Sequence, residues 1–312
     1  MRKLATTLFA LTALWSIAHA TPTVEVVEET DTYRLVRHDG GETEAPTNPQ
    51  RIVSLFDGVT DTMLALGKMP VGVATVYPEF LTYFANDLEQ AGVVNVGSRD
   101  EPNLEAILAA QPDLILTSDW YPESYAQLSR IAPTVFIGVD AADAAGVPRF
   151  RRAMEDVSKV LGLEEAAAAR MAAYEAKVAE AKDALSEVQG KPVSVIRMHP
   201  NGILVVPVDL VPVVFDDLAL TPDPFSLSRN RDNLFVSLEV LPQIRAEHIF
   251  LITENAEVYN NLTSSPLWQN LAAVQAGRVY EMSIDHWTFG YGVIAAELII
   301  DDVLASLTDQ RD

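Results

Sequence analysis

Short apolar runs alternate with amphipathic segments along most of the chain. Residues 52–55 and 71–73 are apolar runs typical of buried strands, and the segment between them has apolar positions at helical spacing that end near Gly67. A strand, a short helix and a second strand in so few residues predict a βαβ unit. Such a unit implies a parallel sheet.

The same alternation continues on both sides of a helical stretch. Further strands are predicted at 113–116, 134–137, 193–196, 203–206, 249–252 and 278–280, and helices from Asn103, over 121–131, from Ser237 and over 293–307. Residues 104, 107 and 108 are expected to face inward from the helix that Asn103 caps. Residues 21–48 are predicted to form an edge hairpin or a loose tail.

Long helices are predicted in the middle of the chain. Residues 150–161 end at Gly162, and residues 164–188 contain many Ala, Glu and Lys but no Gly or Pro. We therefore predict an α/β protein with two lobes, each with a mainly parallel sheet flanked by helices, joined by one long α-helix. The expected limits are residues 21–146 for the first lobe, 147–162 for the connecting helix and 163–312 for the second lobe.

The first twenty residues differ from the rest. Arg2 and Lys3 precede an apolar run over 4–17, and Ala18, His19 and Ala20 follow it. This pattern predicts a secretory signal peptide cut after Ala20, because the run is too short for a typical membrane span and the small residues suit a signal peptidase. A soluble exported protein, most simply periplasmic, is the expectation.

Composition narrows the classes of function. The 312 residues include 44 Asp and Glu against 22 Lys and Arg, a net charge of −22, and no Cys. Nucleic acids and anionic membranes would repel such a chain. Thiolate metal sites and disulfides are excluded, and the five His lack metal-ligand spacing, so no direct metal site is expected. The chain also has no nucleophile-elbow, zinc-protease or phosphate-loop motif, which argues against an enzyme.

One short pattern occurs twice. Residues 103–105 are Asn-Leu-Glu and residues 237–239 are Ser-Leu-Glu, and each triplet opens a predicted helix that leads into an apolar run. A glutamate in a first helical turn is favoured by the helix dipole alone. At equivalent places in two lobes, however, Glu105 and Glu239 could form two acidic projections that meet arginines on a two-fold symmetric partner.

Several motifs together carry a family resemblance. They are residues 49–55 (PQRIVSL), 96–99 (VGSR), 102–107 (PNLEAI), 111–116 (QPDLIL), 131–135 (IAPTV), 236–239 (VSLE), 266–268 (PLW), 273–280 (AVQAGRVY) and Trp287 before the last helix. In this order they resemble the periplasmic iron–siderophore binding proteins of ABC importers, especially the ferric citrate binding branch. The resemblance extends from about Pro49 to the end.

The resemblance implies a function and partners. The protein would hold a ferric siderophore between its lobes, with no intrinsic cofactor, and deliver it as a monomer to an importer permease in the inner membrane, onto which Glu105 and Glu239 would dock. A helical connector implies modest closure of the lobes. A haem- or corrinoid-binding protein of the same architecture is the alternative, with Tyr77, Tyr121, His199 or His286 as possible haem ligands. A secreted enzyme is the remaining alternative.

Candidate ligand-binding residues follow the predicted strands, because ligands of parallel α/β lobes bind at the carboxyl ends of strands. Arginine can grip carboxylates or other siderophore oxygens, and aromatic rings can pack on the body of a chelate. The alternative for each arginine is a surface ion pair, while Trp268 is expected in the core. The ligand-binding candidates are Tyr77, Arg99, Trp120, Tyr121, Arg197, Arg229, Arg231 and Trp287.

Overall fold

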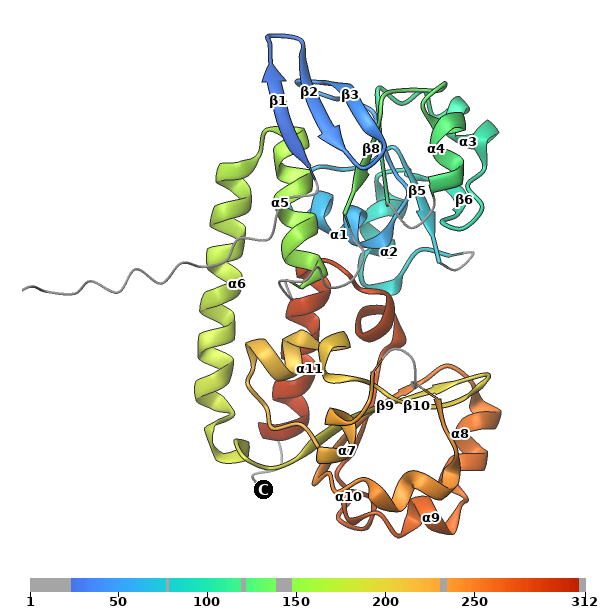
Figure 1. The fold of residues 1–312 in the computed structure, drawn as a ribbon, viewed down its shortest axis with the longest axis vertical. Helices are drawn as coiled ribbons and strands as arrows, with labels where there is room; N and C mark the ends of the chain where they lie inside the picture. Colours follow the sequence, from blue (N-terminus) through green and yellow to red (C-terminus); the bar gives the residue numbers. More distant parts are fainter. Residues whose placement is uncertain (1–23, 77–78, 119–121, 139–147, 231–234, 309–312) are drawn as a thin grey trace, which may run out of the picture.

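The computed structural model describes residues 24–76, 79–118, 122–138, 148–230 and 235–308. They form two lobes, one above the other in Figure 1, with one long helix along the side of both. The α/β class and the two-lobed arrangement predicted from the sequence are confirmed.

The N-terminal lobe contains a five-stranded parallel sheet in the order β6-β5-β4-β7-β8. Successive side chains of β7 point to opposite faces: Leu114 and Leu116 join the core under α5, and Ile115 joins the core under α3. The strands are β4 (Ile52–Ser54), β5 (Gly72–Thr75), β6 (Val94–Ser98), β7 (Leu114–Ser118) and β8 (Thr134–Ile137). The helices are α1 (Asp57–Ala65), α2 (Thr82–Gln90), α3 (Leu104–Ala109), the 3₁₀ turn Pro122–Ser124 and α4 (Tyr125–Leu128).

A separate antiparallel sheet precedes this lobe. Its strands β1 (Glu25–Glu29), β2 (Tyr33–His38) and β3 (Gly41–Pro46) pair in sequence order. The Thr43 hydroxyl donates to the Thr134 carbonyl of β8 at 2.9 Å. The edge hairpin that the sequence allowed is therefore a three-stranded sheet anchored on β8.

Two helices follow the N-terminal lobe. Helix α5 (Arg149–Leu161) ends at Gly162, which has a left-handed φ of 65°, and the predicted stop is confirmed. Helix α6 (Glu164–Ala184) then runs beside both lobes (Figure 1). Val157 of α5 lies in the N-terminal core, whereas Tyr174 of α6 lies in the C-terminal core. The predicted connector, residues 147–162, covers α5, whereas the helix that runs beside both lobes is α6, and the limits of the lobes and the connector stay a prediction.

The C-terminal lobe has a mixed sheet in the order β11-β10-β9-β12-β13. Strands β9, β12 and β13 are parallel, while β10 and β11 are antiparallel to their neighbours. The strands are β9 (Val193–His199), β10 (Gly202–Val205), β11 (Phe235–Val236), β12 (His248–Thr253) and β13 (Val279–Met282). Its helices include α7 (Pro224–Leu227), α8 (Ala256–Thr263), α9 (Pro266–Gln269), α10 (Ala272–Gln275), the 3₁₀ segments η2 (Ser186–Val188), η3 (Val208–Leu210) and η6 (Leu238–Gln243), and the π-helical segments η4 (Val213–Asp217) and η7 (Asp285–Phe289).

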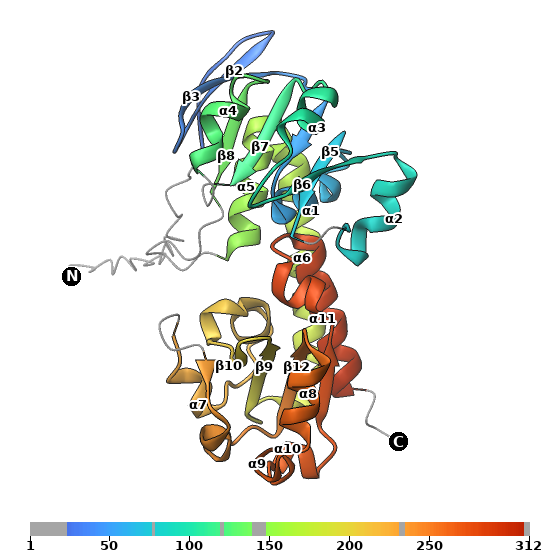
Figure 2. The same cartoon turned by 90° about the vertical axis from the view of Figure 1, so that its right-hand side faces the viewer.

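The last helix joins the two lobes. Helix α11 (Val293–Thr308) begins beneath the upper lobe and continues down the lower one (Figure 2). Its start packs against α1, and its apolar face joins the C-terminal core. Within the described residues, none of the helices combines the length and the hydropathy needed to cross a membrane.

Two carboxylates, one from each lobe, accept hydrogen bonds from the backbone of the other lobe. Asp61 of α1 accepts hydrogen bonds from the backbone N–H groups of Ile294 and Ala295, at 2.9 and 3.0 Å. Asp285 accepts from the backbone N–H of Thr82 at 2.9 Å and from its hydroxyl. Each carboxylate thus satisfies the start of a helix in the other lobe, and we call the two interactions the reciprocal caps.

Removing the Asp61 cap should destabilise the fold. Asp61→Ala leaves the N–H groups of Ile294 and Ala295 at the start of α11 without an acceptor, so the free energy of unfolding should fall by about 2–4 kcal/mol. Asp61→Asn keeps one acceptor oxygen and should cost less. Urea unfolding measures both variants.

The matched control is Asp87→Ala, which removes an exposed carboxylate from α2 and should change stability by less than about 0.5 kcal/mol. Equal stabilities of the Asp61→Ala and Asp87→Ala proteins would contradict the capping role.

Candidate ligand-binding site between the lobes

Residues 285–292 pass between the lobes and connect β13 to α11, and we call them the interlobe segment. Tyr291 stacks on Phe56 of the N-terminal lobe with ring centroids 5.4 Å apart. Gly58 of α1 lies so near that a Cβ there would be 2.9 Å from the Tyr291 carbonyl oxygen, and a Cβ on Gly292 would overlap the Asp61 carboxyl group. The absence of side chains at these two glycines lets α1 touch the backbone of the segment.

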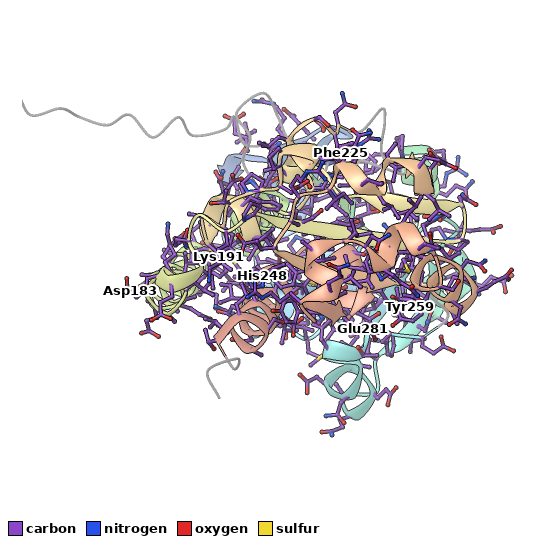
Figure 3. The ribbon with its side chains drawn as sticks, turned by 90° about the horizontal axis from the view of Figure 1, so that it is seen from below. Asp183, Lys191, Phe225, His248, Tyr259 and Glu281 are labelled. Atoms are coloured by element: carbon purple, nitrogen blue, oxygen red, sulfur yellow. The ribbon has the colours of Figure 1, made fainter. Side chains whose placement is uncertain are left out.

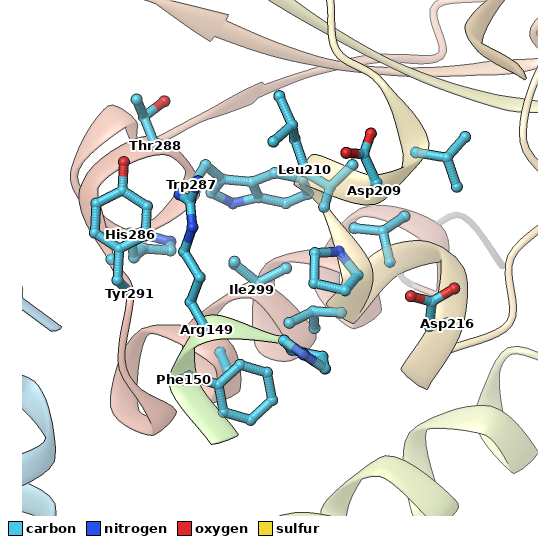
Figure 4. A pocket seen from close by; sticks show the side chains of 18 of the residues that line it. Arg149, Phe150, Asp209, Leu210, Asp216, His286, Trp287, Thr288, Tyr291 and Ile299 are labelled. Atoms are coloured by element: carbon cyan, nitrogen blue, oxygen red, sulfur yellow. The ribbon is translucent and has the colours of Figure 1, made fainter. Parts of the chain in front are cut away.

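A cavity of about 420 Å³ opens on one side of this segment (Figure 4). The start of α5, the chain after β10, α7 and the start of α11 complete its walls. Its volume suits a small organic ligand, and most of its lining is apolar or aromatic, as is usual for such sites. The side chains that give it chemical character are Arg149, Phe150, Asp209, Asp216, Arg229, His286, Trp287 and Tyr291.

Trp287 lines the cavity and is held rigidly. Its indole Nε1 donates to Asp302 Oδ2 at 2.8 Å, and its ring packs on Phe250 with centroids 5.2 Å apart. His286 Nε2 lies 2.6 Å from the same carboxylate oxygen. Burial opposes ionisation of Asp302, but the hydrogen bonds from His286 and Trp287 prevail and hold its pKa below the ordinary value. A rigid aromatic wall can hold a ligand with little loss of side-chain entropy.

Two arginines reach the cavity, of which the sequence identified one. Arg229 stacks over Phe225, 5.4 Å from the ring centroid, and donates to the Phe235 carbonyl at 3.4 Å. Arg149 lies over the Tyr291 ring at 5.0 Å (Figure 4). Sequence reasoning missed Arg149 because it belongs to the predicted connecting helix and follows no predicted strand directly. Pro148 marks the start of this helix in the sequence, but only the structure places that start beside the C-terminal lobe.

Arg99 and Arg197 meet on the Phe289 ring. Arg99 follows β6 in the N-terminal lobe and lies 5.7 Å from the ring centroid, while Arg197 on β9 of the C-terminal lobe lies 5.6 Å from it. Both guanidinium groups therefore sit beside the interlobe segment, although neither residue lines the cavity. The structure thus divides the described candidates into two groups, with Arg229 and Trp287 at the cavity and Arg99 and Arg197 at Phe289.

Each arginine of the Phe289 group has an acidic partner. Arg99 Nη1 lies 3.3 Å from Asp57 Oδ2, and Arg197 Nε hydrogen-bonds to Glu254. The expected alternative of an ion pair is present at both positions, but these pairs lie between the lobes, with Arg99 only 11% exposed. The local charge is therefore compensated, and an anionic ligand has to compete with two carboxylates.

Asp57 is an unusual member of this group. Its side chain is fully buried, and its Oδ1 has no hydrogen-bond partner among the described residues. Burial raises its pKa to about 7, although the charge of Arg99 favours the ionised form. The charge on this carboxyl group, and hence the compensation of Arg99, changes close to neutral pH.

Four ligand-binding candidates, Tyr77, Trp120, Tyr121 and Arg231, lie outside the described residues and stay predictions. Trp268 is buried, as expected for a core residue. In the described ranges, no three His, Asp or Glu side chains gather as metal ligands.

The two glutamates of the repeated pattern are both exposed, one in each lobe. Asn103 caps α3 by accepting from the Ala106 N–H at 3.0 Å, as predicted. The second helix is instead the short 3₁₀ segment η6, and a hydrogen bond from Ser237 lowers the pKa of Glu239. The inward orientation predicted for residue 108 is wrong, because Leu108 is 61% exposed. It lies three residues after Glu105, on the same outer face of α3.

A two-lobed α/β fold, with arginines and aromatic rings of both lobes on the segment between them and a cavity beside that segment, defines a ligand-binding protein of the bilobed class. The sequence model of the periplasmic binding protein family matches residues 52–285. The chain belongs to this family.

Individual relatives agree with this assignment. The chain is 32% identical to the probable siderophore-binding lipoprotein YfiY of Bacillus subtilis, over 86% of each chain. It is 28% identical to the achromobactin-binding periplasmic protein of Dickeya dadantii, over 82% of this chain and 85% of the relative. The crystal structure of Staphylococcus aureus SirA complexed with staphyloferrin B superposes with a TM-score of 0.73 at 28% identity, covering 88% of this chain and 98% of that one.

The buried Asp57 should make stability depend on pH. Because the folded state holds a proton on Asp57 up to about pH 7, whereas an unfolded Asp releases it near pH 4, the free energy of unfolding should fall as pH rises between these values. In Asp57→Asn this contribution, up to roughly 4 kcal/mol, should be absent.

The measurement is urea unfolding of both proteins at several pH values across this window, with Asp87→Asn on the surface of α2 as the control. A constant difference in stability between Asp57→Asn and the natural protein across the window would show that Asp57 titrates normally.

Proposed function

We propose that this protein is the periplasmic binding component of an ABC importer and that it captures a ferric siderophore between its lobes. The observation that carries the proposal is the convergence of arginine and aromatic side chains from both lobes on the interlobe segment. Relatives named for siderophore binding support this ligand class. We place the mature protein in the periplasm, after removal of residues 1–20.

The two groups of side chains would have different tasks. Trp287, Tyr291 and Phe150 offer apolar surface for the organic body of a chelate, and Arg149 and Arg229 offer cationic hydrogen-bond donors at the same cavity. Arg99 and Arg197 lie at the Phe289 ring outside the cavity lining, and the charge of each is compensated by a paired carboxylate. A polyanionic chelate can displace these pairings, whereas a small weak anion gains too little.

The proposal includes no chemical step on the ligand. The iron is cargo that arrives wrapped in its chelator, and the protein supplies binding, orientation and delivery without an intrinsic cofactor. We propose that it acts as a monomer. The reciprocal caps favour a modest closure of the lobes, because a wide opening would break hydrogen bonds at two helix starts.

Ferric siderophores should quench the intrinsic fluorescence of the protein, because Trp287 lines the cavity. The test titrates the mature protein with ferric citrate, a ferric hydroxamate, a ferric catecholate and haem. Saturable quenching by at least one ferric siderophore is expected. Binding of haem alone would favour the haem-binding alternative, and the absence of binding by all four ligands would overturn the proposal.

The arginines should contribute to this affinity. Arg229→Gln and Arg149→Gln should each weaken binding about tenfold or more, since a charge-assisted hydrogen bond contributes roughly 1.5–3 kcal/mol. Arg130→Gln, which removes an exposed arginine after α4, is the matched control and should leave affinity unchanged. Equal affinities of all three variants would place the ligand elsewhere.

Docking on the permease should depend on the two exposed glutamates. Glu105→Arg combined with Glu239→Arg should abolish siderophore-dependent uptake while leaving affinity for the ligand unchanged, because both residues lie on the outer surface. Uptake of radiolabelled ferric siderophore by cells that carry the variant measures this effect.

The matched control reverses two other exposed glutamates, Glu89 on α2 and Glu257 on α8, and so introduces the same change of charge with one site in each lobe. Equal loss of uptake in both double variants would indicate a general effect of charge, and unchanged uptake in the first would rule out docking through Glu105 and Glu239.

A further inference from the structure

The C-terminal lobe has a second polar pocket, at the edge of its sheet where the parallel strands begin. His248 is the first residue of β12 and lies opposite Val193, the first residue of β9. Lys191 precedes β9 by two residues, and Arg278 directly precedes β13. Because parallel strands begin at one edge of a sheet, three basic residues that are distant in sequence gather there. Figure 3 shows Lys191 and His248 next to each other on this end of the molecule.

The pocket has a volume of about 190 Å³. The ends of two helical segments, α6 and η2, form one wall, and the end of α11 forms another. Its lining consists of Ala184, Glu187, Val188, Lys191, His248, Arg278 and Leu307. None of these residues lines the cavity beside the interlobe segment, so the two pockets are separate sites.

His248 leaves one nitrogen without a partner. The side chain is 4% exposed, and its Nδ1 lies 3.1 Å from the Tyr280 hydroxyl, whose ring stacks against it. Its Nε2 is buried and has no hydrogen-bond partner among the described residues. A neutral imidazole that accepts from Tyr280 at Nδ1 carries its proton on Nε2, and this donor is then unsatisfied.

The charges around His248 are only partly compensated. Lys191 forms no ion pair with any described residue, and Arg278 reaches only the Glu247 carboxylate, at 3.4 Å. Burial lowers the pKa of His248, and the charges of Arg278 and Lys191 lower it further, while Glu247 acts in the opposite sense. Glu187 is the one acidic residue among those that line the pocket. Although the chain has a net charge of −22, the Lys191 ammonium and the His248 Nε2–H thus stay available to an anionic ligand.

We propose that this pocket binds a small oxyanion of the phosphate or sulfate type, held by the Lys191 ammonium, the Arg278 guanidinium and the His248 Nε2–H. The three groups line one pocket and supply positive charge and hydrogen-bond donors, which is the chemistry that oxyanions require. The bound anion satisfies the buried His248 donor, which has no other acceptor in the described structure.

This assignment has a direct consequence for His248. An anion beside the imidazole stabilises its protonated form and offsets the two cations, so binding should raise the pKa of His248. By linkage, the affinity for the anion should increase as pH falls through that pKa. An anion that binds only the folded state should also raise the thermal stability of the protein.

The experiment follows the His248 imidazole signals by NMR during pH titrations of the mature protein. One series contains inorganic phosphate and the other contains sodium chloride at equal ionic strength. We expect a higher His248 pKa in phosphate and a saturable dependence on phosphate concentration. An identical His248 pKa in the two series would overturn the proposal.

Lys191→Gln gives the decisive comparison. Removing this cation should by itself raise the His248 pKa in chloride, and it should weaken phosphate binding about fivefold or more. Lys68→Gln, in the other lobe, makes the same change in net charge and should behave like the natural protein. Equal responses of the two variants to phosphate would show that general screening, and not this pocket, causes the effect.

Discussion

The reciprocal caps hold the two lobes together across their boundary. Asp61 satisfies the start of α11 from one side, and Asp285 satisfies the start of α2 from the other. The first N–H groups of a helix have no partner within it, so separating the lobes would leave both helix starts without their acceptors. The interlobe segment, which lies between these two interactions, is thereby fixed relative to both sheets.

A fixed interlobe segment means that the ligand site exists before any ligand arrives. Trp287 is held by Asp302, and Phe289 lies against guanidinium groups from both lobes. Binding then requires little ordering of side chains, which lowers its entropic cost. The carboxylates of Asp57 and Glu254 compensate Arg99 and Arg197 in the same preformed arrangement. Selectivity among anions therefore depends on which ligand can replace those carboxylates.

The sequence predicted local elements well because apolar runs, glycine stops and helix caps are local signals. Most strands of both sheets, the stop at Gly162 and the cap at Asn103 follow from neighbouring residues, whereas the edge strands β6 and β11 were not predicted. Contacts over long distances carry no such signal: Asp61 and Ile294 are 233 positions apart. The sequence identified Arg197 and Trp287 as candidates because both follow or end predicted strands. For the same reason it did not show that they belong to two separate groups, or that Arg149 lines the cavity. Leu108 was misplaced because α3 is too short to bury a broad face.

The topology of the C-terminal sheet explains why cationic side chains gather at two places in so acidic a chain. Strands β9 and β12 run parallel from one end of the lobe to the other. Near their carboxyl ends they place Arg197 against Glu254 beside the interlobe segment, and at their amino ends they bring Lys191 to His248. At the first end the carboxylate of Glu254, directly after β12, neutralises the cation, so a ligand must displace it. At the second end no described carboxylate forms an ion pair with Lys191. Burial and the charges of Arg278 and Lys191 lower the pKa of His248 there, which keeps its imidazole neutral. The same pair of strands thus builds one compensated site and one that is open to an anion.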